Sequence, residues 1–389
     1  MPLVPVEMAV GHVLARPLIT ADGRLMLQSN SVLSQADVAA IQRRLGLRLV
    51  DVRSDILPDV ALHDEDIAVE ARADATRAIA QTIAAVAARP HPPAAAPLVA
   101  AATKVLDATL TMDGALVALV TMRAQDDSLL QHGVNTAVYA VLIGLGRSLR
   151  RDALLALSLG GMLHDLGKAL LRPGVLAKTG KLTPEEAAHV QTHPKMGYDL
   201  IRRDYPKFAM TVADIAYLHH ERLNGTGYPR ALAAAQIPLV ARIATIADVF
   251  DALCAVRPYK PGWAPHRAAA YLRRHPEWFD ADLVDLFLRQ VALYPSGTLV
   301  ATRGARVGLV IGQNQGVPGA PVLLVLGERG RGPETPYVLD LGRAPGELPV
   351  AQSLRHLPRG WADRIDREAA REAAETYLSG RLRGRAGSA

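Results

Sequence analysis

The sequence is poor in cysteine and in aromatic residues. Cys254 is the single cysteine among 389 residues, which excludes a framework of internal disulfides and is typical of a reducing compartment. It also excludes a metal site built from several cysteines. Aromatic residues make up 4% of the chain, so a core must be built mainly from small and branched aliphatic side chains, which favours packed helices.

Long apolar runs and a secretion signal are also lacking. No stretch reaches the roughly 18 uninterrupted apolar residues that span a bilayer, and the N-terminal stretch MPLVPVEMAVGHVLARPL lacks a basic start followed by an apolar core. The formal net charge of +6, from 44 basic and 38 acidic residues, is small. Apart from a basic C-terminal tail it is spread along the chain, which does not indicate nucleic-acid binding. We therefore expect a soluble, cytoplasmic protein that binds neither a membrane nor a nucleic-acid polymer.

The order of helix and strand patterns predicts a multidomain, mainly α protein. Residues 1–53 alternate short β-like runs with one helix and predict a small α+β module. Residues 54–100 predict a helix followed by a Pro/Ala-rich linker, and residues 101–290 predict an all-α helical bundle. Residues 291–389 predict a small β-rich region, a sheet or a barrel, followed by a terminal helix.

One apolar stripe is expected on the terminal helix. Trp361, Ile365, Ala369, Ala373 and Tyr377 recur at intervals of four residues. Such a stripe most often docks on its own domain, and a homodimer interface is the alternative.

The segment GGMLHDLGKALL, residues 160–171, places ionisable side chains in an apolar setting. His164 and Asp165 are adjacent, and Lys168 follows four residues after the histidine, which predicts that His164 and Lys168 share one helix face. Burying such groups without partners is costly in free energy. A bound cation would offset that cost, so the segment predicts a metal site.

Further candidate ligands occur in the same helical region. They are His132, His193, His219, His220 and Asp248. Taken singly, a buried histidine is most often a hydrogen-bonded core residue, and the prediction therefore depends on the ordered set. Mixed nitrogen and oxygen ligands suit iron, manganese or zinc. Among the other histidines, His189 is ambiguous because it lies one turn before His193.

Such a ligand set has a definite chemistry. A carboxylate has two oxygens, so Asp165 could bridge two metals. Two metals a few ångström apart can hold a bridging hydroxide and neutralise a phosphate. Lys168 would then place a positive charge at the phosphate's non-bridging oxygens.

These residues resemble the HD-GYP branch of the HD phosphohydrolase superfamily. Between about residues 124 and 275 the chain carries, in order, His132, HDLGK, KTGKLTPEE, THPKMGYDLI, HHERLNGTGYP and IADVFDALCAVRPYK. Members of that family hydrolyse cyclic di-GMP, a bacterial second messenger, at a helical-bundle site with two or three metals. The resemblance implies a cyclic di-GMP phosphodiesterase that forms linear pGpG and, by a second cleavage, GMP. The N-terminal module also resembles the small domain often found ahead of this one.

The resemblance implies a role for each matching residue. The implied metal ligands are His132, His164, Asp165, His193, His219, His220 and Asp248, with Asp165 as the bridging carboxylate. Asp165 and Lys168 would act in catalysis, and Lys168, Arg257 and Lys260 would bind the substrate phosphates. Gly227, Tyr228 and Pro229 form the GYP signature of a loop beside the site. The expected cofactors are two divalent ions, iron or manganese.

Two positions depart from the family pattern. Family members with a third metal carry a glutamate where this chain has Ser128, so two metals are expected. Asn224 replaces the usual aspartate before the GYP loop, and either residue caps a turn. Two alternatives stay open. One is another cyclic dinucleotide as substrate, such as cyclic GMP-AMP, and the other is a signalling adaptor that binds diguanylate cyclase (GGDEF) domains through the GYP loop.

Overall fold

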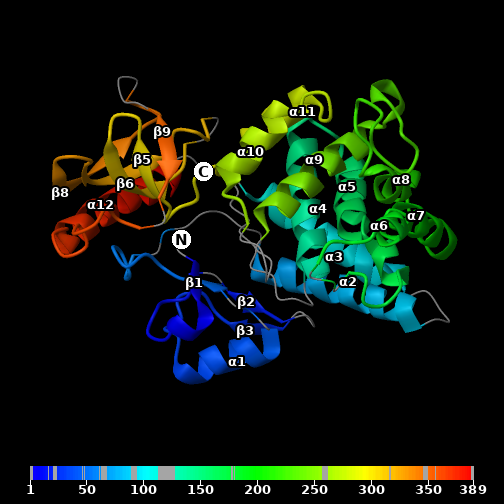
Figure 1. Cartoon of the computed structure of the whole chain (residues 1–389), viewed down its shortest axis with the longest axis horizontal. Helices are drawn as coiled ribbons and strands as arrows, with labels where there is room; N and C mark the ends of the chain where they lie inside the picture. The colour runs from blue at the N-terminus through cyan, green and yellow to red at the C-terminus, as the bar shows by residue number, and fades with distance from the viewer. Residues whose placement is uncertain are drawn as a thin grey trace.

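The structure is a computed structural model, and its elements gather into three parts (Figure 1). It describes residues 3–386 except for 16, 21–23, 46, 48, 61, 63–67, 89–93, 113–127, 177, 179, 256–261, 315–316, 345–348 and 355. A small α+β part comes first, a helical domain follows, and a β-sheet with a terminal helix ends the chain. The predicted fold class is therefore confirmed.

The N-terminal part is built from two short strand pairs and one helix. The elements are β1 (Leu3–Pro5), β2 (Leu18–Ile19), β3 (Leu25–Leu27), α1 (Gln35–Leu45) and β4 (Leu49–Asp51), with a 3-10 turn at Val6–Met8. β1 pairs with β4 and β2 pairs with β3, both antiparallel. Ser34 caps α1, because its hydroxyl accepts a hydrogen bond from the Asp37 amide at 3.2 Å.

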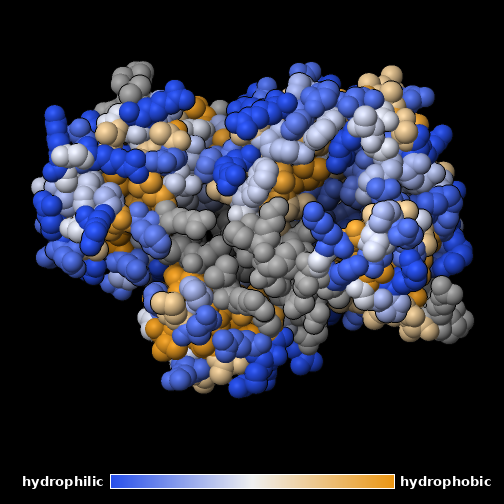
Figure 2. All heavy atoms as spheres, in the orientation of Figure 1, coloured by the Kyte–Doolittle hydropathy of each residue, from blue (hydrophilic) through white to orange (hydrophobic). Residues whose placement is uncertain are grey.

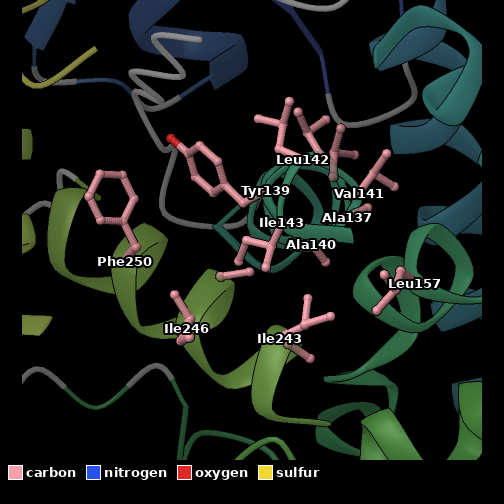
Figure 3. Packing of buried hydrophobic residues seen from close by; sticks show 14 of the residues in the cluster. Ala137, Tyr139, Ala140, Val141, Leu142, Ile143, Leu157, Ile243, Ile246 and Phe250 are labelled. Atoms are coloured by element: carbon pink, nitrogen blue, oxygen red, sulfur yellow. The ribbon is translucent and has the colours of Figure 1, made fainter. Parts of the chain in front are cut away.

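The helical domain is organised around α4. Its elements are α2 (Val69–Ala88), α3 (Ala95–Leu110), α4 (Ser128–Gly146), α5 (Arg151–Leu163), the 3-10 helix η2 (Leu166–Leu170), α6 (Pro184–Val190), α7 (His193–Asp204), α8 (Met210–Leu218), the 3-10 helix η3 (Ala234–Gln236), α9 (Leu239–Cys254), α10 (Pro265–Arg274) and α11 (Ala281–Leu288). α4 packs against α2, α3, α5, α9 and α11. Figure 3 shows Ile243, Ile246 and Phe250 of α9 beside Tyr139 and Ile143 of α4.

Burial explains the apolar character of α4. The window Leu129–Gly146 has the length and hydropathy of a membrane-spanning helix, yet 78% of it is buried inside the protein. Hydrophilic residues cover much of the helical domain on the face drawn in Figure 2. The helix is therefore the central core helix of this domain.

Glycines allow α4 and α5 to approach closely. A Cβ atom at Gly161 would lie 2.5 Å from the Cα of Ala137, and one at Gly133 would lie 2.9 Å from the carbonyl oxygen of Met162. Larger residues at these positions would force the two helices apart. The close contact brings the start of α4 beside the end of α5, where His132 and His164 lie.

The helix within residues 54–100 is part of the same core. Ala75, Ala78 and Ile79 of α2 are buried in the cluster that also holds the side chains of α4, α5 and α9. The Pro/Ala-rich stretch separates α2 from α3, and both helices pack against α4. The helical packing therefore begins before residue 101.

The C-terminal part is a five-stranded antiparallel sheet with the order β8-β7-β6-β5-β9. The strands are β5 (Leu299–Thr302), β6 (Arg306–Gly312), β7 (Val322–Glu328), β8 (Gly332–Asp340) and β9 (Val350–Ser353). These strands lie in the β-rich region that the sequence predicts for residues 291–389, and of the two alternatives, a sheet or a barrel, the structure has the sheet. Ile56, Leu57 and Val60, which follow the N-terminal module, are buried in one cluster with residues of β6 and β7.

The terminal helix α12 (Arg367–Ala386) packs on β7 and β8, so the expected docking on its own domain is confirmed. The prediction that one helix carries the whole stripe was wrong, because Trp361 and Ile365 lie in the turns before it. The Asp366 carboxylate accepts a hydrogen bond from the Ala369 amide at 3.0 Å and so caps the helix start. Trp361 and Ile365 nevertheless contribute to the same buried cluster as α12.

Candidate metal centre

The HD pair lies at a break between two helices. α5 ends at Leu163, and η2 begins at Leu166. The prediction that His164 and Lys168 share a helix face was wrong, because the chain changes helix type between them. Lys168 Nζ instead donates to Asp165 Oδ2 at 2.5 Å. Gly167 allows η2 to pack closely against the start of α7, since a Cβ atom there would lie 2.0 Å from the carbonyl oxygen of His193.

The structure brings the seven predicted ligand residues together from several elements. They are His132 of α4, His164 and Asp165 after α5, His193 at the start of α7, His219 and His220 after α8, and Asp248 of α9. The residues separated by more than a hundred positions meet because α4, α5, α8 and α9 pack against one another. All but His220, which is partly exposed, are buried.

The ligand atoms lie within contact distance of each other. His132 Nε2 is 3.2 Å from His164 Nε2 and 2.9 Å from Asp248 Oδ1. On the other side, Asp165 Oδ1 lies 3.2 Å from His193 Nε2 and 3.7 Å from His219 Nε2. His220 Nδ1 completes the cluster at 3.9 Å from Asp248 Oδ2.

Hydrogen bonds to backbone carbonyls orient three of the imidazoles. The Nδ1 atoms of His164, His193 and His219 lie 2.8, 2.7 and 3.0 Å from the carbonyl oxygens of Gly161, Val190 and Ala216. A carbonyl only accepts, so each Nδ1 carries the hydrogen. Each Nε2 therefore presents a lone pair to the cluster, as metal-binding histidines do.

Burial and charge set the protonation states. Burial lowers the pKa of His164, of His219 and of His220, the last to about 3, so these imidazoles are neutral at neutral pH. Burial alone would raise the pKa of the Asp165 carboxyl, but the positive charge of Lys168 holds that pKa well below its usual value. Burial is likewise outweighed at Asp248 by the close approach of His132, and the pKa of this carboxyl is also well below normal. Neutral imidazoles and ionised carboxylates are the metal-binding forms.

Asp165 fits the position of a shared metal ligand. Its Oδ1 is buried and accepts no hydrogen bond from the described residues. The neighbouring His193 Nε2, 3.2 Å away, is a second lone pair and cannot satisfy it. Asp165 belongs to two groups whose ligand atoms lie within 4.8 Å of one another, one with His132 and His164 and the other with His193, His219 and His220. A divalent cation in each group would resolve this unfavourable contact between acceptors.

The GYP loop lies directly over the cluster. The Tyr228 ring stacks on His220 with 4.6 Å between ring centroids, and burial raises the pKa of the phenol, which stays neutral. The Tyr228–Pro229 peptide bond is cis. Gly227 must be a glycine, because a Cβ atom there would lie 2.4 Å from the Cα of Glu221. Before the loop, Asn224 Oδ1 accepts from the Thr226 amide at 3.2 Å and forms the expected turn.

Two supporting carboxylates were missed in the sequence. Glu221 is buried and accepts hydrogen bonds from the amides of Arg230 and Leu232 at 2.7 and 2.9 Å, which ties down the GYP loop. Asp251 Oδ2 lies 2.7 Å from His132 Nδ1. Asp251 follows Asp248 by three residues on α9, a helical spacing that could have indicated it.

Not every candidate joins the cluster. His189 lies in neither group of ligand atoms, and its Nε2 accepts a hydrogen bond from the Arg172 amide at 3.0 Å. Arg257 and Lys260 lie outside the described residues.

Comparison with known proteins identifies the class of the central domain. Residues 119–283 match the HD domain family. The resemblance inferred from the sequence is thereby confirmed for residues 119–283, the part of the helical domain that is similar to HD domains.

Curated relatives share this part of the chain. Cyclic di-GMP phosphodiesterase PA4108 of Pseudomonas aeruginosa is 40% identical over 205 residues, which cover 51% of this chain and 48% of the relative. The cyclic di-GMP phosphodiesterase response regulator RpfG of Xanthomonas campestris is 41% identical over 39% of this chain and 40% of its own length. The 3'3'-cGAMP-specific phosphodiesterase 2 of Vibrio cholerae is 39% identical over 32% of this chain and 24% of its own length. The chain thus spans about half or less of the length of these relatives.

Proposed function

We propose that the protein is a metal-dependent phosphodiesterase that hydrolyses cyclic di-GMP to linear pGpG, and to GMP by a second cleavage. The observation that carries the proposal is Asp165, whose unsatisfied oxygen lies between two groups of imidazoles. Two relatives that are about 40% identical over the HD domain are named cyclic di-GMP phosphodiesterases, which supports this substrate. Such a substrate also agrees with a cytoplasmic location.

The ligand set accommodates two divalent ions, for which we propose iron or manganese. One ion would be held by His132, His164, Asp165 and Asp248, and the other by Asp165, His193, His219 and His220. When bound, such ions supply a water of lowered pKa and positive charge at the phosphate. The lack of cysteine ligands and the mixed nitrogen and oxygen donors fit these metals.

The chain's own residues would bind and orient the phosphate. The side chain of Lys168 is 22% exposed, and its ammonium is held against Asp165, so it can reach a phosphate oxygen without leaving the centre. The neutral Tyr228 phenol over His220 can donate a hydrogen bond to the substrate. We assign Arg257 and Lys260 to the binding of the dinucleotide phosphates, on the family resemblance alone.

A competition assay tests this function. Purified protein is incubated without oxygen with Fe²⁺ or Mn²⁺ and with equal concentrations of cyclic di-GMP and 3',3'-cyclic GMP-AMP, and the products are separated by chromatography. Asp165→Ala serves as the inactive variant, and Asp199→Ala is the matched control, because Asp199 lies on the surface and pairs with Lys195.

We expect faster loss of cyclic di-GMP, with pGpG appearing first, in wild type and in Asp199→Ala. Faster loss of the mixed ring would favour the alternative substrate, in line with the Vibrio cholerae relative. If the folded protein binds metal and turns over neither ring, the hydrolase proposal is wrong. Binding to diguanylate cyclase domains through the GYP loop would then be the function to test.

A further inference from the structure

We propose that Arg72, on α2, is a positioning residue for the metal centre and acts through Asn135 and Asp251 on His132. The inference rests on the proposed function, since it assumes that His132 binds a metal. Arg72 lies well before residues 119–283, the part of the chain that matches the HD domain family. It therefore extends the centre to a helix that the family match does not include.

A continuous line of buried hydrogen bonds joins Arg72 to His132. Arg72 Nη1 donates to Asn135 Oδ1 at 2.9 Å, and Asn135 Nδ2 donates to Asp251 Oδ1 at 2.7 Å. The other oxygen of Asp251 accepts from His132 Nδ1 at 2.7 Å. The exposed fractions of Arg72, Asn135, Asp251 and His132 are 8%, 0%, 1% and 6%. Bulk water is thus excluded from most of the line.

The chemistry of these groups decides which one donates and which one accepts in each hydrogen bond of the line. A guanidinium has only donors, so Arg72 requires the oxygen of Asn135 to face it. The amide nitrogen of Asn135 must then face Asp251, which as a carboxylate only accepts. The Nδ1–H of His132 is a second donor to Asp251, and His132 Nε2 is left with its lone pair 2.9 Å from Asp248 Oδ1.

Without Arg72 this arrangement of donors and acceptors would be lost. The Asn135 amide could turn over and place its oxygen against Asp251, which would weaken the hold of that carboxylate on His132. Arg72 also supplies a positive charge that is separated only by the Asn135 amide from the buried Asp251 carboxylate, three residues after Asp248 on α9. Removing a buried partner charge is unfavourable because it leaves the remaining charge uncompensated.

Neighbouring side chains hold the guanidinium in place. Gln131 Oε1 lies 3.4 Å from Arg72 Nη1, and Gln131 Nε2 donates to Thr76 Oγ1 at 3.2 Å. Thr76 in turn donates to the Arg72 carbonyl at 2.8 Å. These contacts hold Arg72 against α4 at Gln131, the residue just before His132. A lysine would offer a point charge in place of the planar fork.

The test measures metal affinity directly, on the full-length protein. Mn²⁺ dissociation constants are determined by competition with a chelator for wild type, Arg72→Met and Arg72→Lys, and the melting temperature of each metal-free protein is recorded. Arg77→Met is the matched control, because Arg77 lies on the same helix, is exposed and pairs with Asp74. We expect Arg72→Met to weaken Mn²⁺ binding by about tenfold, the lower end of the effect of residues that orient a metal ligand. Arg72→Lys should recover part of the loss, and Arg77→Met should bind as wild type does.

A second variant covers the case in which Arg72→Met fails to fold. Asn135→Ala interrupts the same line while Arg72 stays in place, and it should weaken Mn²⁺ binding to a similar extent. Variants that bind Mn²⁺ as tightly as wild type, with or without a lower melting temperature, would show that Arg72 is only structural and would overturn the inference. If wild type itself binds no Mn²⁺, the metal centre is wrong and the inference fails with it.

Discussion

The helical domain and the C-terminal sheet bury their polar side chains in different ways. In the sheet region, the Thr302 hydroxyl accepts from the Arg306 amide at 3.2 Å, and Asn314 Nδ2 donates to the Ala320 carbonyl at 2.8 Å. These groups are matched to the backbone. In the helical domain, His193 Nε2 and Asp165 Oδ1 are buried acceptors 3.2 Å apart. Polar groups that pair with the backbone support a fold, whereas buried acceptors that face each other indicate a ligand.

Removing the shared carboxylate should have the largest effect. Asp165→Ala is expected to lower cyclic di-GMP hydrolysis at least about a thousandfold, since it removes a group on which both halves of the centre depend. The metal-free variant should melt close to wild type, because Oδ1 has no hydrogen-bond donor among the described residues and Oδ2 is paired with the partly exposed Lys168. Product chromatography and thermal melts measure the two effects. A rate close to that of wild type would contradict the assignment of Asp165.

A cavity in the sheet should affect stability alone. Leu324 of β7 is fully buried in the cluster with α12. Leu324→Ala is expected to lower the free energy of unfolding by about 3 kcal/mol, through lost apolar contact and an unfilled cavity. Urea titration measures the loss, and the Mn²⁺ dissociation constant should stay at the wild-type value. A parallel loss of metal affinity would show that the C-terminal sheet and the metal centre are energetically coupled.

Metal should stabilise the helical domain and leave the sheet unaffected. At a free Mn²⁺ concentration of 100 times the dissociation constant, binding should add about 2.7 kcal/mol to the free energy of unfolding, because the cation binds only the folded cluster. Denaturant titration with and without a chelator measures this gain. Leu324→Ala should keep it, and Asp165→Ala should lose most of it. An equal gain in Asp165→Ala would place the bound ion elsewhere.

Separating α4 from α5 should have the smallest effect of the four. In Gly161→Ala the new Cβ atom would meet the Cα of Ala137 at 2.5 Å, so the helices must move apart. We expect a loss of about 2 kcal/mol in stability from this overpacking. Mn²⁺ binding should also weaken, because His132 and His164 lie at the same contact. Gly180→Ala is the control, since a Cβ atom there meets nothing within 4 Å. Equal stabilities of the two variants would contradict the close packing.

Much of the fold and of the candidate site could be predicted from local patterns. The motif HDLGK and the pair His219–His220 indicated a metal centre before any contact was known, because a buried imidazole or carboxylate needs a partner. The break after Leu163 could not be predicted in this way. After the break, Gly167 lies against the start of α7, a contact between segments that are distant in the sequence. The start of the terminal helix was misplaced although a local signal was present, because the cap at Asp366 was overlooked.

The sequence by itself determined the chemistry: which ionisable residues occur, in which order and in how apolar a setting. It also determined the types of most elements, because apolar periodicity and turn residues act over a few positions. Only the tertiary structure decided which atoms meet. Arg72, Asn135 and Asp251 form one line because α2, α4 and α9 pack together. No local pattern contains that line, since the contacts join residues more than fifty positions apart and exist only when the core is assembled.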